Sequence, residues 1–204
     1  MSTSPYPVRL VGGHDLERSR LTVFFRIFLL IPHAIVLALY GIAAYIVAVI
    51  AWFAALFTGR VPGGMHDFIA GFARYNARVL AYGTILANPY PPFGPGGSYA
   101  VDLEVDPPVA QGRLGVFFRL ILAIPCWFVM SILQNLLELL AIGNWIVAVI
   151  TGRVPNGMQT LGLFCLRFMA RTTTYILLVN PRYPAFGETP GSLPADQASL
   201  PPIP

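Results

Sequence analysis

An internal repeat is the feature that most constrains how this sequence can fold. The segment TGRVPGG, which starts at Thr58, returns 93 residues later as TGRVPNG, which starts at Thr151. The same gapless offset aligns three further pairs of segments: RLTVFFRIFLLIP (20–32) with RLGVFFRLILAIP (113–125), YPPF (90–93) with YPAF (183–186), and YPVRL (6–10) with YAVDL (99–103). The chain is therefore a tandem duplication, and its two units are expected to share one shape.

The duplication predicts two domains, one over residues 1–95 and one over residues 96–188. Residues 189–204 follow the second unit and are rich in proline and small polar residues. Such a composition is typical of a disordered tail.

The composition is that of a membrane protein. Apolar residues make up 56% of the chain and charged residues 11%, and the mean hydropathy is +0.67. A soluble domain carries about 25% charged residues. From Leu21 to Phe57 the only ionisable side chains besides tyrosine are Arg26 and His33, and a bilayer span needs about 20 apolar residues. The net charge of +4 comes without acidic or basic runs, so no nucleic-acid partner is expected.

The long apolar run of each unit is too long for one straight span. Residues 21–57 would form a helix of about 55 Å, against about 30 Å of hydrocarbon in a bilayer. Pro32 and Pro125 can each start a new helix, because proline is tolerated in a first helical turn. The alternative is a division of the first run into two spans near Gly41.

The predicted fold is an all-α integral membrane protein with four transmembrane helices, two interfacial helices and a short strand at the start of each repeat. The segments are strands Tyr6–Leu10 and Tyr99–Leu103, interfacial helices 19–31 and 113–124, spans 33–57 and 126–150, and returning spans 65–87 and 158–179. The two strands are expected to pair with each other, because a lone strand leaves its backbone groups unpaired.

Each TGRVP segment is interpreted as the turn between two spans. Thr-Gly ends one helix, and the proline that follows cannot continue it. Two crossings per unit put both termini on one side of the membrane. The repeats are then related by an axis along the membrane normal, with Arg60 and Arg153 on the same side. Most arginines outside the spans lie on the terminal side, so the positive-inside rule predicts cytoplasmic termini.

Four motifs carry a resemblance to a known family: IPH (31–33), TGRVPGG (58–64), RYNARV (74–79) and NPYPPF (88–93). Together they resemble the signature of a bacterial membrane family called domain of unknown function 4389, over both units. The second unit departs from it, with Cys126 in the place of His33. The resemblance implies a bacterial integral membrane protein, and it implies no activity. With the predicted spans, the expected location is the bacterial cytoplasmic membrane, as a multi-pass protein.

Two arginine pairs are the main candidates for a site. Arg74 and Arg78 recur as Arg167 and Arg171, and a spacing of four residues puts each pair on one helix face. Arginine in an apolar helix is costly and is a functional candidate by default. The pairs are interpreted as an interhelical ion-pair network, as an anion or lipid-headgroup site, or as a translocation path.

Few carboxylates are available to neutralise these arginines. Asp67 lies on the same stripe as Arg74 and Arg78, and Glu138 lies within the apolar helix of the second unit. Because these two are the only carboxylates near the predicted spans, at least one arginine pair is expected to face lipid headgroups or another protein. Arg60 and Arg153 are either simple turn residues or a phosphate site beside a helix N-terminus.

No enzymatic chemistry is predicted. His14, Asp15 and Glu17, and the neighbours His66 and Asp67, could each start a metal site, but neither spacing recurs in the other unit. No metal or other cofactor is expected, and the sequence shows no nucleophile motif.

The expected function is that of a non-enzymatic scaffold or accessory subunit of a larger bacterial membrane complex. The alternative is a lipid- or anion-binding carrier or channel that uses the intramembrane arginines. The expected partners are membrane lipids and other membrane subunits or a second copy of the chain.

Overall fold

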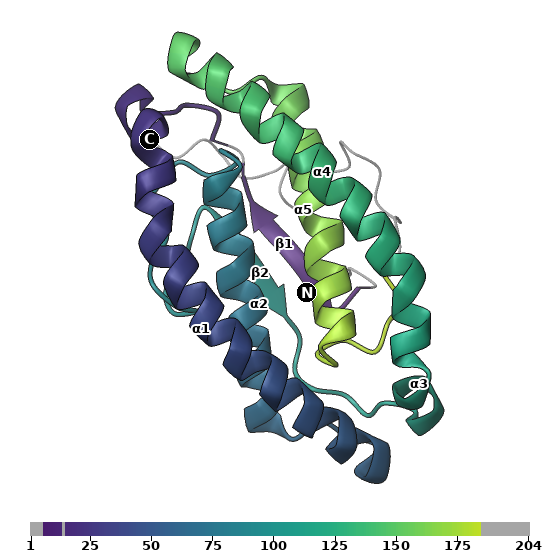
Figure 1. Cartoon of the computed structure of the whole chain (residues 1–204). Coiled ribbons are helices and arrows are strands. Elements are labelled where there is room, and N and C mark those ends of the chain that lie inside the picture. Colours follow the sequence, from purple (N-terminus) through teal and green to yellow (C-terminus); the bar gives the residue numbers. More distant parts are fainter. Residues whose placement is uncertain (1–5, 14, 185–204) are drawn as a thin grey trace, which may run out of the picture.

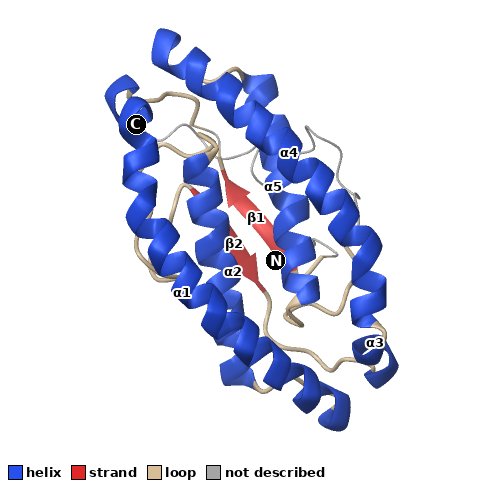
Figure 2. Cartoon of the chain, viewed as in Figure 1, coloured by secondary structure: helices blue, strands red, loops and turns tan. Residues whose placement is uncertain are grey.

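The computed structural model describes residues 6–13 and 15–184, and within them the fold is mostly helical (Figures 1 and 2). The predicted tail at 189–204 and His14 of one candidate metal cluster lie outside the described residues. In chain order the elements are β1 (Val8–Gly12), α1 (Arg20–Thr58), α2 (Gly63–Gly83), β2 (Val101–Val105), α3 (Arg113–Phe117), α4 (Arg119–Thr151) and α5 (Asn156–Ile176).

The predicted break between interfacial helix and span is wrong in both repeats. Helix α1 continues through Pro32, and α4 continues through Pro125. The buried face stays in phase across each proline, since Arg26 and His33 are both buried and lie seven residues apart. Seven residues are close to two helical turns. Packing of one continuous face therefore outweighs the cost of about 3 kcal/mol for an internal proline.

The alternative break near Gly41 is also wrong. Gly41 lies inside α1 and is buried, and a Cβ atom there would lie 3.4 Å from the Phe72 ring of α2. In the second repeat the chain does break, but at Phe118 between α3 and α4 rather than at Pro125.

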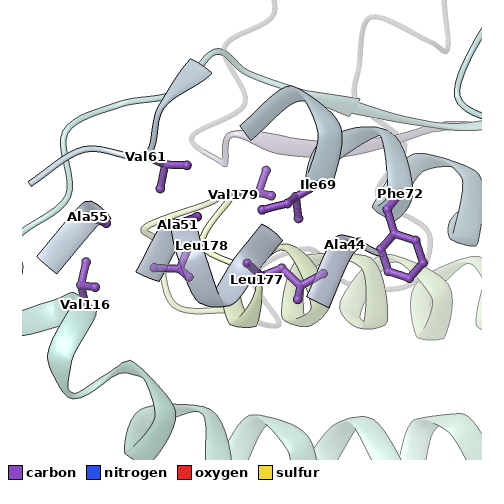
Figure 3. Packing of buried hydrophobic residues seen from close by; sticks show 11 residues of the cluster. Ala44, Ala51, Ala55, Val61, Ile69, Phe72, Val116, Leu177, Leu178 and Val179 are labelled. Carbon is purple, nitrogen blue, oxygen red and sulfur yellow. The ribbon is translucent and has the colours of Figure 1, made fainter. Parts of the chain in front are cut away.

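The helices and the sheet form three layers. Helix α2 packs against the small side chains Ala44, Ala51 and Ala55 of α1 through Ile69 and Phe72 (Figure 3). Its opposite face carries Ala73 and Ala77, which pack with residues of the two strands. Helix α5 has the same relation to α4 on one side and to the strands on the other. Helices α1 and α4 thus form one outer layer, α2 and α5 the middle layer, and the sheet the third.

The two outer helices run antiparallel. The amide of Arg18, just before α1, donates to Gly152 O at the end of α4 (2.8 Å), and the amide of Gln111, before α3, donates to Gly59 O at the end of α1 (2.9 Å). Each helix therefore ends where the other begins (Figure 1). The four-span arrangement, in which both TGRVP loops lie at the same end of a helical bundle, is wrong.

Each strand packs on the middle helix of the other repeat. Strands β1 and β2 pair antiparallel, with Leu10 opposite Leu103 and Val8 opposite Val105. Strand β2, which precedes the second repeat, packs on α2 of the first repeat, and β1 packs on α5 of the second. The repeats are therefore intertwined, and neither can bury its middle helix without a strand from the other.

A buried arginine closes the end of each middle helix. Arg26 Nη1 donates to the carbonyls of Tyr82 (2.7 Å) and Ala87 (3.0 Å), and its Cζ lies 4.3 Å from the centre of the Tyr82 ring. Arg119 makes the equivalent contacts at the end of α5, with its Cζ 4.8 Å from the Tyr175 ring. A cation at a helix C-terminus interacts favourably with the helix dipole. The internal symmetry thus extends to side-chain contacts.

The symmetry also offers a matched test of one contact. Trp52 Nε1 donates to Val116 O (3.0 Å) and so ties the end of α1 to α3. The equivalent Trp145 Nε1 has no acceptor among the described residues. We expect Trp52→Phe to lower the free energy of unfolding by about 1 kcal/mol more than Trp145→Phe, because one hydrogen bond is lost in addition to ring volume. Unfolding midpoints in detergent would measure this difference, and equal losses would contradict it.

Candidate functional site

Arg74 and Arg78 of α2 converge on one carboxylate. Their Nε atoms donate to Asp102 Oδ1 at 2.8 and 2.9 Å, and their Nη2 atoms donate to Asp102 Oδ2 at 2.6 and 2.9 Å. The spacing of four residues puts both guanidiniums on the face of α2 that meets β2. Asp102 thus receives two bidentate ion pairs, which are the strong form of this interaction.

Burial makes this cluster important for stability. Asp102 is 5% exposed, and the side chain of Arg78 is fully buried. Burial raises the pKa of Asp102, but the hydrogen bonds from Arg74 and Arg78 outweigh burial and lower the pKa to about 2. The carboxylate is therefore ionised in the folded protein at neutral pH.

A glycine-containing loop supplies the remaining acceptors of Arg78. Its Nη1 donates to Gly96 O (2.6 Å) and its Nη2 to Gly97 O (2.7 Å), and Gly94 O lies 3.4 Å from Nη1. Gly94 and Gly97 have φ angles of +87° and +69°, a conformation in which glycine has no steric penalty. Each nitrogen of the Arg78 guanidinium thus has a protein acceptor.

The two carboxylates proposed as arginine partners do not take that role. The Asp67 side chain is 78% exposed, and it lies 3.3 Å from His66 Nδ1. Glu138 is exposed on α4, where it accepts a hydrogen bond from Gln134 (2.8 Å). Among the described residues neither carboxylate forms an ion pair with an arginine.

The second arginine pair has different surroundings. The Cζ atom of Arg171 lies 4.3 Å from the centre of the Tyr6 ring, and Arg171 is 5% exposed. Arg167, one turn earlier on α5, is partly exposed. The residue of β1 that the repeat aligns with Asp102 is Arg9, which pairs instead with Glu104 (3.4 Å) and Asp106 (3.2 Å). The position of β1 that corresponds to Asp102 thus carries a cation instead of a carboxylate.

Asp102 is the site residue that the sequence analysis missed. Asp102 lies outside every predicted span, in a strand that packs on the other repeat. A signal was present in the alignment of YPVRL with YAVDL, where Arg9 is replaced by an acidic residue. Arg74 and Arg78 thus have a carboxylate within the chain that is neither Asp67 nor Glu138. That at least one arginine pair faces lipid headgroups or another protein stays a prediction for Arg167 and Arg171.

Arg60 and Arg153 occupy two turns of the same construction. Gly59 and Gly152 end α1 and α4 with φ angles of +73° and +75°, as helix C-caps commonly do. The amides of Arg60 and Arg153 each donate to the threonine hydroxyl two residues earlier, at 3.2 Å. Arg153 also lies 3.4 Å from Glu17, with both side chains largely exposed. The turn that each TGRVP segment forms therefore explains why the segment recurs in both repeats.

His33 is a packed residue of the first repeat. It is fully buried, its Nδ1 lies 2.7 Å from the Tyr75 hydroxyl, and its ring stacks on Phe93 with centroids 4.4 Å apart. The second repeat has Cys126 and Phe168 at the positions of His33 and Tyr75. The histidine and tyrosine thus form a polar contact that the second repeat replaces with apolar groups.

An open cleft of about 820 Å³ lies beside Arg74. Its charged lining comprises Arg9, Arg74, Asp67, Glu104 and Asp106. The carboxylates outnumber the guanidiniums, and both arginines are already paired with carboxylates. This balance gives the cleft no excess of positive charge for an anion. Among the described residues no group of three His, Cys, Asp or Glu side chains could hold a metal ion.

The fold and site define an internally duplicated, mostly helical protein in which two helices, α1 and α4, are long and apolar enough to span a membrane. The chain belongs to the family described as Domain of unknown function (DUF4389), which matches it twice, at residues 20–94 and 113–187. Arg74 and Arg78 lie within the first match, whereas Asp102 lies between the two. No curated protein and no solved structure matches the chain.

Because Arg74 is partly exposed and Arg78 is buried, we expect their replacement to lower the stability by different amounts. Arg78→Ala should lower the free energy of unfolding by about 3–5 kcal/mol, because it removes the fully buried partner of Asp102 and leaves two glycine carbonyls without their donor. Arg74→Ala should cost less, since the Arg74 side chain is 35% exposed and Asp102 keeps Arg78. Thermal or denaturant unfolding in detergent would measure both variants. A loss for Arg74→Ala equal to that for Arg78→Ala would contradict the expectation.

The lowered pKa of Asp102 predicts a dependence of stability on pH. In the unfolded chain its pKa is about 3.9, and in the folded protein it is about 2. The ionised carboxylate therefore stabilises the fold above about pH 4, and this contribution is lost as the pH falls toward 2. We expect Asp102→Asn to be less stable at pH 7 and to show a weaker pH dependence of its unfolding midpoint in this window.

The control for the pH experiment is Glu104→Gln on the same strand. Glu104 is 52% exposed and pairs with Arg9, and exposed ion pairs contribute little. This variant should keep the acid sensitivity of the unchanged protein. If the unfolding midpoint of Asp102→Asn depended on pH as strongly as that of the unchanged protein, other carboxylates would be responsible for the acid sensitivity.

Proposed function

We propose that this protein is a non-enzymatic, membrane-bound scaffold or accessory subunit of a larger complex in the bacterial cytoplasmic membrane. The observation that carries the proposal is that the Arg74 and Arg78 guanidiniums are directed at Asp102 and loop carbonyls inside the protein. A cluster of this kind fixes how helices and strands dock, and every nitrogen of the Arg78 guanidinium already has an acceptor inside the protein.

The outer surface supports a membrane location. Most of the large apolar side chains that are exposed belong to α1, α3 and α4. Exposed apolar patches beyond a few hundred Å² mark interaction surfaces or membrane contacts. Because α1 and α4 are also the two candidate membrane helices, lipid is the solvent that we propose for this surface.

The middle helices α2 and α5 have a different role in this proposal. They are largely buried between the outer helices and the sheet. We propose that they hold the polar third layer, formed by the sheet and its loops, against the membrane-bound layer. The polar layer would then face the cytoplasm together with the termini and would present the surface that a partner subunit contacts.

The carrier or channel remains the competing function, and no contact in the site favours it. Arg78 is fully engaged, and the cleft beside Arg74 has more carboxylates than guanidiniums. A carrier for anions needs a site whose positive charge is available to the ligand. We therefore place the scaffold first.

Purification from native membranes in mild detergent tests the proposal. A scaffold or subunit should retain a protein partner in fixed stoichiometry after size-exclusion chromatography. Surface variants such as Glu104→Gln and Asp106→Asn keep the buried cluster intact, and we expect at least one change on the sheet layer to release the partner. A protein that purifies alone, with tightly held phospholipid or anion that Arg74→Gln removes, would favour the carrier instead.

A further inference from the structure

We propose that α1 and α4 lie flat in one leaflet of the membrane, with their exposed apolar faces toward the acyl chains, and do not cross the bilayer. This inference rests on the proposed membrane location and specifies the lipid surface that the protein contacts. It follows from the length of the helices, the position of their polar groups and the layering of the fold.

Helix length is the first argument. Helix α1 has 39 residues and α4 has 33, so α1 is about 58 Å long and α4 about 50 Å, at 1.5 Å per residue. The hydrocarbon core of a bilayer is about 30 Å thick. A crossing orientation, even with the usual tilt of about 20°, would leave more than a third of α1 outside the hydrocarbon.

The exposed stripe of α1 shows no boundary where a crossing helix would leave the hydrocarbon. Leu21, Phe28, Ile35, Ile46 and Phe57 are each at least half exposed, and they span the whole helix. The two ionisable side chains of this stretch besides tyrosine, Arg26 and His33, are buried on the opposite face. One apolar stripe along the full length is the pattern of a helix that lies in the interface plane.

Polar residues near the centre of α4 argue against a crossing orientation. Asn135 and Glu138 are exposed about halfway along this helix, where a crossing helix would meet the middle of the bilayer. Ionisable residues inside membranes almost always face a protein interior or a water-filled cavity. A helix that lies in the interface plane is buried only about 5–10 Å into the boundary between headgroups and acyl chains, so in a flat orientation Glu138 stays away from the middle of the bilayer.

The layering puts the polar groups on the opposite side of the molecule. Helices α1 and α4 both lie on the side of α2 and α5 that faces away from the sheet. The sheet layer carries Arg9, Glu104 and Asp106. Laid flat, the protein therefore directs its apolar layer into the lipid and its charged layer toward water.

Arginines at both ends of the outer layer complete the argument. The Arg20 side chain lies against Gly152, next to Arg153, and the Arg113 side chain lies against Gly59, next to Arg60. All four arginines are exposed. In a flat orientation both pairs reach phosphates of the same leaflet, and a surface of anionic lipid attracts basic side chains that lie next to it.

Thiol labelling in cells distinguishes the two orientations. Gly64 and Gly157 lie at opposite ends of the outer helices, and a Cβ atom at either position meets nothing within 4 Å. Gly64→Cys and Gly157→Cys would be treated with a membrane-impermeant maleimide, once in intact spheroplasts and once in everted vesicles. The unsubstituted protein is the control, because Cys126 and Cys165 are both buried.

The flat orientation predicts that both thiols react in the same preparation and that neither reacts in the other. Labelling of one position in spheroplasts and the other in everted vesicles would show that the helices cross, and would overturn this inference while leaving the membrane location intact. Any other distribution of label also overturns it. Recovery of the chain from the soluble fraction, as a dimer that covers the apolar faces, would overturn the membrane location as well.

Discussion

The ion pairs of Asp102 with Arg74 and Arg78 depend on an exchange of strands between the two repeats. Asp102 reaches α2 because β2 leaves its own repeat and packs on the other. Removing the fully buried Arg78 would leave Asp102 with only the partly exposed Arg74, and breaking a buried ion pair is strongly destabilising. The cluster therefore favours the intertwined arrangement over two separate units, each of which would leave one face of its middle helix uncovered.

This exchange also explains why so apolar a chain keeps a polar layer. The middle helices contact apolar side chains of α1 and α4 on one face and the strands on the other. Arg74 and Arg78 of α2 face β2, where Asp102 and loop carbonyls accept their hydrogen bonds. Charged side chains thus lie mainly in the interior and on the sheet side, and the outer helices have few of them along most of their length.

The sequence predicted the repeats, their gapless offset, the TGRVP turns and the approximate positions of the helices. It misplaced the helix breaks, because the cost of an internal proline is local, whereas the packing that outweighs it involves residues such as Tyr75 and Tyr82 on another helix. It also missed the antiparallel relation of α1 and α4, since that relation depends on contacts between residues such as Arg18 and Gly152. Asp102 was missed for the same reason, because its partners lie in the other repeat.

Two differences between the copies show how the same backbone accepts different side chains. Arg18 Nε donates to Ile85 O (3.1 Å), and at the equivalent position Gln111 Nε2 donates to Leu178 O (2.7 Å). Both acceptor residues have a positive φ, +65° and +63°, so the backbone geometry is retained while the donor changes. Arg9 and Asp102 differ in charge instead. Arg9 lies directly opposite Glu104 and forms an ion pair with it, whereas Asp102 lies opposite Val11 and receives the hydrogen bonds of Arg74 and Arg78. The change from a cation to a carboxylate at this one repeat position therefore creates the buried cluster of the first repeat.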